Sequence, residues 1–158
     1  MMSNVLPPTS TRVARASRPY LNERIRMRAD ARVARLEEGK PIELEARLDE
    51  LDGEWDIERL LQANASTLVM IGVALGYAWD RRFLLLPAAV LTFFAQHALQ
   101  GWCPPIPVFR RRGVRTRREI ERERYAIKAL RGDFDGVPPA GSADAATRAR
   151  AALAAVDR

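Results

Sequence analysis

The sequence predicts an all-α membrane protein, with two transmembrane helices forming a hairpin and amphipathic cytoplasmic helices before and after it. Residues 60–79 carry no charged side chain, and residues 83–109 again contain no Asp, Glu, Lys or Arg. The polar turn Asp80-Arg81-Arg82 separates these two stretches, and charge is dense on either side of them. A soluble helical protein usually mixes charge into every helix, so this segregation favours a membrane hairpin over a buried soluble helix pair.

The segment before the hairpin divides into an arm and a helical region. Residues 1–18 are polar and contain two adjacent prolines, which is typical of a disordered arm. Residues 19–55 are expected to form a cytoplasmic helical region with one-sided apolar spacing. Gly39 ends its first helix, and a second helix begins at Pro41 and is broken at Gly53.

The hairpin itself is predicted to occupy residues 56–109, with spans at about 60–79 and 83–102. Each span has about twenty residues, which at 1.5 Å per residue gives roughly 30 Å, the thickness of a hydrocarbon core. Asp56 is a suitable N-cap for the first span, and Gly101 is a suitable end for the second.

Two further regions follow the hairpin. Residues 110–134 are expected to form a basic cytoplasmic helix, because Thr116 and Glu119 have the spacing of a capping box and Gly132 is a natural helix stop. Residues 135–158 are expected to be a flexible, Ala-rich tail that contains at most a weakly held helix.

Aromatic and basic residues predict the orientation. Tyr77 and Trp79 lie at the turn, and Trp102 lies at the opposite end, where membrane interfaces are expected. The turn has two basic residues and residues 110–129 have nine, so the positive-inside rule places both termini in the cytoplasm. Residues 1–17 have no apolar run, and we expect the internal spans to direct targeting.

The basic tract after the second span has two favoured interpretations. It acts as a topology signal, or it binds anionic lipid headgroups, at about 1 kcal/mol for each nearby charge. No nucleic-acid-binding motif accompanies it, so no nucleic-acid partner is expected. The residues concerned are Arg110, Arg111, Arg112, Arg115, Arg117 and Arg118.

Small residues four apart in the first span predict close helix packing. Gly72 and Gly76 form a GxxxG motif, and Ala74 and Ala78 form a second small pair. The seam would serve either a homodimer or packing against the hairpin's own second helix, and the sequence leaves both open.

Few residues are candidates for chemistry. Cys103 is the candidate redox thiol, since nearby arginines would lower its pKa, although a helix C-terminus would raise it and a simple packing role is the alternative. His97 is expected to hydrogen-bond Gln96, Gln100 or Thr92. One Cys and one His are too few for a structural zinc site. No catalytic residue, metal or cofactor is predicted.

The stretch Leu68–Tyr77, the short polar turn and Phe83–Leu86 resemble the YgaP-like inner-membrane transmembrane family of bacteria, as does the ending Gly101-Trp102-Cys103-Pro104-Pro105. The resemblance covers about residues 59–113 and implies a bacterial inner-membrane location and dimerisation through the hairpin. The family's rhodanese domain has no counterpart here, so sulfurtransferase activity is not carried over.

The expected function is therefore non-enzymatic: a self-associating membrane anchor or interaction module that contacts lipid and an unidentified membrane or cytoplasmic protein. One alternative is a redox or sulfur-relay accessory that uses Cys103. Another is a soluble, basic nucleic-acid binder. Replacing Cys103 with Ser would separate the first alternative from an anchor, and carbonate extraction would separate the second.

Overall fold

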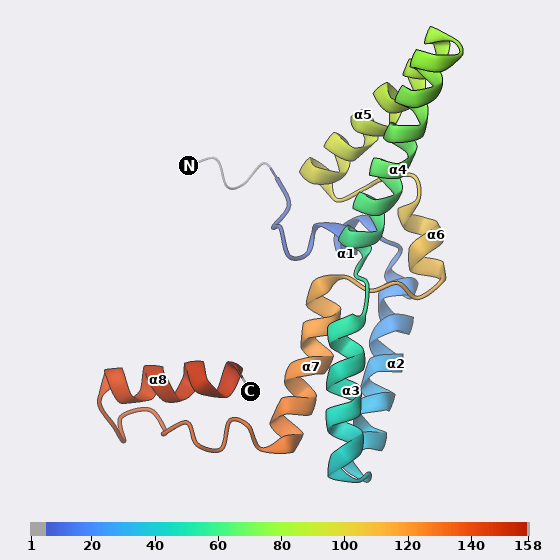
Figure 1. Cartoon of the computed structure of the whole chain (residues 1–158). Helices are drawn as coiled ribbons and strands as arrows, with labels where there is room; N and C mark the ends of the chain where they lie inside the picture. The colour runs from blue at the N-terminus through green and yellow to red at the C-terminus, as the bar shows by residue number, and fades with distance from the viewer. Residues whose placement is uncertain (1–5, 158) are drawn as a thin grey trace. The chain divides into compact units, whose positions relative to one another are not determined.

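The computed structural model describes residues 6–157, and over that range the chain is helical with no strand (Figure 1). The all-α prediction is confirmed. The chain divides into two compact units, one made of residues up to 28 with 54–120, the other of residues 29–53 and 121 onward. The elements are α1 Arg12–Ala16, α2 Pro19–Glu37, α3 Pro41–Gly53, α4 Ile57–Ala78, η1 Arg81–Leu84, α5 Leu85–Gln100, α6 Ile106–Arg111, α7 Arg117–Arg131 and α8 Ala145–Val156.

In the first unit, α4 and α5 form the two long apolar helices. The Asp56 side chain accepts a hydrogen bond from the Arg59 backbone N–H at 2.8 Å, which confirms the predicted N-cap of α4. At the same end of the pair, Gly101 takes a left-handed φ of 77° and ends α5, as expected from the sequence. The polar turn takes the form of the 3₁₀ helix η1, whose N-cap Asp80 accepts from the Arg82 N–H at 2.8 Å. The second helix therefore begins two residues later than predicted.

The helices α4 and α5 lie side by side because α4 presents glycine to its neighbour (Figure 1). A Cβ atom at Gly72 would lie 2.5 Å from Pro87 Cδ, and one at Gly76 would lie 2.6 Å from Leu84 Cδ2. Both glycines are buried. A larger residue at Gly72 would press on the Pro87 ring of α5, and one at Gly76 would displace the Leu84 side chain of η1.

Two helical stretches are long and apolar enough to cross a membrane, the Pro41–Ala78 stretch, whose apolar part is α4, and Arg81–Gln100. Burial inside the chain is slight, reaching 17% of residues in the first apolar window and 11% in the second. The core helix of a soluble protein would be mostly buried, so these helices lack the protein cover that a soluble fold would give them.

The end of the pair where α4 begins and α5 ends, which we call the base, carries the apolar core of the first unit. That core consists of Val13, Ile57, Leu61, Cys103 and Ile106. Val13 belongs to α1, inside the arm predicted to be disordered; residues 1–5 of that arm lie outside the described residues. A Cβ atom at Gly101 would meet the Arg12 carbonyl carbon at 2.4 Å, so α1 packs directly on the end of α5.

The second unit is formed by α3, α8, the end of α2 and most of α7. The boundaries of α2 and α3 match the sequence prediction closely, and Gly132 ends α7 with a φ of 83°. Three leucines of α3 at helical spacing are buried, together with Ile127 of α7. These leucines are Leu44, Leu48 and Leu51.

Candidate functional site

The outer surface of α4 and α5 is the first part of the candidate site. Met70 is 64% exposed, Leu85 is 73% exposed and Leu91 is 54% exposed, and large apolar side chains are exposed on both helices. An isolated exposed leucine needs no explanation, but many large exposed apolar side chains along two helices indicate a membrane or a partner.

Three polar side chains in the first third of α4 each donate one hydrogen bond to a backbone carbonyl of the same helix. Asn64 Nδ2 donates to the carbonyl of Leu60 at 2.8 Å, and Thr67 Oγ1 donates to the carbonyl of Ala63, also at 2.8 Å. Ser66 bonds to the carbonyl four residues before it in the same way. A polar group that finds a partner inside its own helix costs less in hydrocarbon than an unpaired one. These residues are therefore compatible with a lipid environment.

Aromatic residues occupy both ends of the helix pair. Tyr77 and Trp79 are strongly exposed at the η1 end, and Trp55 and Trp102 are exposed near the base. The Arg59 guanidinium lies 4.3 Å from the centroid of the Trp55 ring. Such amphipathic side chains are favoured at the two interfaces of a bilayer.

The predicted packing seam divides between two faces of α4. Gly72 and Gly76 contact η1 and α5, so the intrachain alternative accounts for these two residues. Ala74 and Ala78 are exposed. Self-association through the hairpin stays a prediction, and in this structure the alanine pair is the part of the seam that remains accessible.

A charged cluster joins three helices at the base. His97 of α5 is 2% exposed, and its Nε2 lies 2.7 Å from Glu58 Oε2 of α4. The other carboxylate oxygen accepts from Arg12 Nη2 of α1 at 2.9 Å. Glu58 precedes the uncharged stretch; the hydrogen bond to His97 lowers its pKa below the usual value, against the effect of burial and with help from the charges of His97 and Arg12. The prediction that His97 hydrogen-bonds Gln96, Gln100 or Thr92 is wrong, because its partner is Glu58, 39 residues away.

A second cluster surrounds Arg110, whose side chain is fully buried. Its guanidinium donates to both oxygens of Glu119, at 2.6 and 2.7 Å, and to Asn22 Oδ1 at 2.7 Å. The Thr116 N–H also donates to Glu119 at 2.8 Å, and the Glu119 N–H lies 3.3 Å from Thr116 Oγ1, which confirms the predicted capping box. Burial raises the pKa of Glu119, but the hydrogen bonds from Arg110 and Thr116 and the charge of Arg110 outweigh it, leaving the pKa below its usual value.

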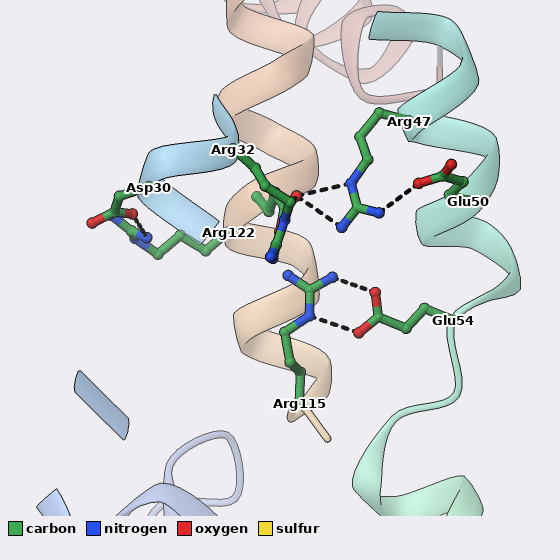
Figure 2. Close-up of polar contacts among 8 residues, drawn as sticks. Asp30, Arg32, Arg47, Glu50, Glu54, Arg115 and Arg122 are labelled. Carbon is green, nitrogen blue, oxygen red and sulfur yellow. Dashed lines mark hydrogen bonds and ion pairs between the residues drawn. The ribbon is translucent and has the colours of Figure 1, made fainter. Parts of the chain in front are cut away.

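The basic tract therefore does not act as one exposed surface. Arg115 is also buried and forms a two-pronged ion pair with Glu54 (Figure 2). Arg110 and Arg115 therefore do not face lipid headgroups. The guanidinium of Arg110 binds Glu119, and that of Arg115 binds Glu54. Arg111, Arg112, Arg117 and Arg118 are exposed.

Cys103, the candidate redox thiol, is 6% exposed among apolar side chains of the base. Burial raises the pKa of this thiol, so less of it is in the reactive thiolate form. The neighbouring Arg110, which was expected to favour the thiolate, is bound to Glu119 instead. Cys103 therefore packs in the apolar core of the base.

Metal-binding clusters are a separate question. Among residues 6–157, no group of three or more His, Cys, Asp or Glu could hold a metal ion.

The second unit holds a different polar feature, which the sequence does not predict. The Glu123 carboxylate of α7 is fully buried and binds two arginines: Arg32 of α2 donates at 2.8 and 3.0 Å, and Arg47 of α3 donates at 2.9 Å. The same guanidinium of Arg47 also donates to Glu50 Oε2 at 2.6 Å. The charged residues of this unit thus bind one another across helices.

Comparison of the chain with protein families, with curated proteins and with solved structures found no match. Membership in the YgaP-like family therefore stays a prediction that rests on the sequence resemblance alone.

Proposed function

We propose that the chain is a non-enzymatic anchor of the bacterial inner membrane, with α4 and α5 as a transmembrane hairpin and both termini in the cytoplasm. The observation that carries the proposal is that these two helices have the length and apolarity of membrane spans while the chain itself buries few of their residues. The internal hydrogen bonds of Asn64, Ser66 and Thr67 support the same conclusion.

The proposed orientation follows from charge. Arg81 and Arg82 at the η1 turn are the only basic residues between the spans, while the region after α5 is rich in arginine. A topology signal acts during insertion, before the chain has folded, so arginines that later become buried still contribute to it. The inner-membrane location and self-association come from the family resemblance and belong to this proposal.

The base supplies the anchor with a fixed platform. Arg12 and Arg110 connect α1 and α6 to the helices around them through the partly buried carboxylates of Glu58 and Glu119. The Arg110 side chain is itself fully buried, so loss of Glu119 would leave an unpaired buried charge, which is strongly unfavourable. We assign to the helices outside the membrane the role of docking a cytoplasmic or membrane protein.

Carbonate extraction of membranes from bacterial cells that express the full chain tests the proposal. An integral hairpin stays in the membrane pellet at alkaline pH, together with a known integral protein. Release into the supernatant would contradict the proposal and would favour a peripheral or soluble basic protein.

A further inference from the structure

An apolar groove opens between α4 and α5 close to the base. Its volume is about 310 Å³, at the lower end of the range for small-molecule sites. Leu68 of α4, Val90 and Phe93 of α5 and the loop residues Cys103 and Pro104 are among the groups that line it. The groove is formed wholly within the first unit, and its walls are almost entirely hydrocarbon.

We propose that this groove holds one acyl chain of an anionic glycerophospholipid, whose headgroup binds Arg111 and Arg112. The inference rests on the proposed membrane location, because only a chain embedded in a bilayer would meet acyl chains at this position. It goes further than that location by assigning a particular site and a particular lipid charge.

One polar side chain, Asn64, lines the groove on the base side of α4. Asn64 lines the groove four residues after the start of the uncharged stretch, about 6 Å along the helix. One of its N–H donors goes to the Leu60 carbonyl. An amide has a second donor and a carbonyl acceptor. The second N–H can donate to an ester carbonyl of the lipid.

The position of the arginines favours an anionic headgroup. The groove ends at Pro104 and Pro105, and α6 leads from there to Arg111. Six helical residues extend about 9 Å, comparable to the headgroup layer of one leaflet, which is about 5–8 Å. Arg110 is neutralised by Glu119, whereas Arg111 and Arg112 are exposed. Arg111 and Arg112, the exposed arginines that follow the groove in the sequence, are therefore the residues to which we assign the headgroup.

Photolabelling of the full chain in vesicles tests the proposal. One set of vesicles contains phosphatidylglycerol with a photoactivatable group in its acyl chain, and the other contains phosphatidylcholine with the same group; labelled peptides are mapped by mass spectrometry. We expect the phosphatidylglycerol probe to label the groove-lining peptides more strongly. The preference should be up to about five-fold for each arginine that contacts the headgroup.

Matched variants define the site. Ala89→Trp places a bulky ring in the groove, while Ala88→Trp adds the same ring at an exposed neighbouring position of α5 outside the groove. Labelling should fall to the phosphatidylcholine level in Ala89→Trp and stay unchanged in Ala88→Trp. The double change Arg111→Gln with Arg112→Gln should abolish the lipid preference, whereas Arg81→Gln with Arg82→Gln at the opposite end should preserve it.

Equal labelling by the two probes, or equal labelling of the two tryptophan variants, would overturn the groove site and indicate ordinary boundary lipid. Circular dichroism shows whether Ala89→Trp keeps its helical content. Ala65→Phe, a second variant that fills the groove, should lower the labelling in the same way. Carbonate extraction of the same samples separates the two proposals. A chain that is retained but lacks selective labelling contradicts only the lipid site, whereas a chain that is released contradicts the membrane location as well.

Discussion

The helix pair α4–α5 and the helices of the second unit differ in where they place their apolar side chains. The pair keeps its apolar side chains outside and uses glycines to bring its two helices together. The second unit keeps leucines inside and, in addition, buries the carboxylate of Glu123 between two arginines. The same chain thus contains one region with its large apolar side chains exposed and one with an apolar interior.

The comparison shows that exposure has a different meaning in the two regions. Met70 of α4 and Ile42 of α3 are equally exposed, at 64% and 65%. Ile42 is a single apolar residue on a charged helix, which is normal for a soluble surface. Met70 is one of many large exposed apolar side chains on a helix with no charged residue from position 60 to its end.

The largest expected effect tests the charged region. Glu123→Gln removes the negative charge between Arg32 and Arg47, and we expect the free energy of unfolding to fall by about 3 kcal/mol. This is the lower end of the range for a broken buried pair, because Arg32 keeps 31% of its side-chain surface exposed. Chemical denaturation of the full chain in detergent would measure the change.

Glu50→Gln is the matched control, since Glu50 also binds Arg47 but its side chain is 65% exposed. We expect a loss below about 1 kcal/mol for this exposed pair. Equal effects of the two substitutions would mean that Glu123 is not the buried centre of the second unit.

The next effect tests the apolar region. Met70→Arg puts a charge in the middle of α4, and we expect a cost of insertion of about 2.5 kcal/mol. The fraction of chain recovered in the membrane pellet should fall accordingly. Ile42→Arg changes an equally exposed residue and should alter stability by no more than about 0.5 kcal/mol. If the two substitutions behave alike, α4 faces water.

A smaller effect distinguishes the two faces of α4. Gly72→Leu forces a side chain into Pro87, and overpacking of this kind costs about 1–3 kcal/mol. Ala74→Leu adds the same bulk on the exposed face and should leave the thermal midpoint of unfolding in detergent unchanged. If Ala74→Leu instead abolished crosslinking between two copies, the alanine face would be the self-association surface.

The smallest expected effect concerns pH and the base. The pKa of Glu119 is lower in the folded chain than its ordinary value of 4.5, so folding is favoured by its ionised form. That contribution is complete above pH 4.5 and is lost as the pH falls through the lowered pKa. The difference in thermal midpoint between the wild type and Glu119→Gln should therefore shrink as the pH falls below 4.5. A difference that grows with acidity would contradict the role of Arg110 as its partner.

Much of the helical architecture is readable from local sequence. The uncharged stretches, Asp56, Gly101 and Gly132 predict where helices begin or end, because capping and glycine preferences depend on a few neighbouring residues. The capping box of Thr116 and Glu119 is confirmed for the same reason.

Contacts between distant residues could not be predicted in this way. Glu58 meets His97 across 39 residues, and Glu123 meets Arg32 across 91. In a chain with 26 basic and 20 acidic residues, charge alone selects no particular pair. The helices α1 and α6 were also missed, since at five and six residues they are too short to form without tertiary packing.

Cysteine accessibility in bacterial cells is the most direct test of the central claim. Single cysteines are introduced in a Cys103→Ser background by Arg81→Cys at the η1 turn, by Ile42→Cys before the hairpin and by Leu153→Cys after it, and are treated with a membrane-impermeant thiol reagent. We predict labelling from outside only at position 81, with the other two positions labelled after the membrane is opened. Protection of position 81 together with labelling of either arm from outside, or no membrane retention of the chain, would contradict a hairpin with both termini in the cytoplasm.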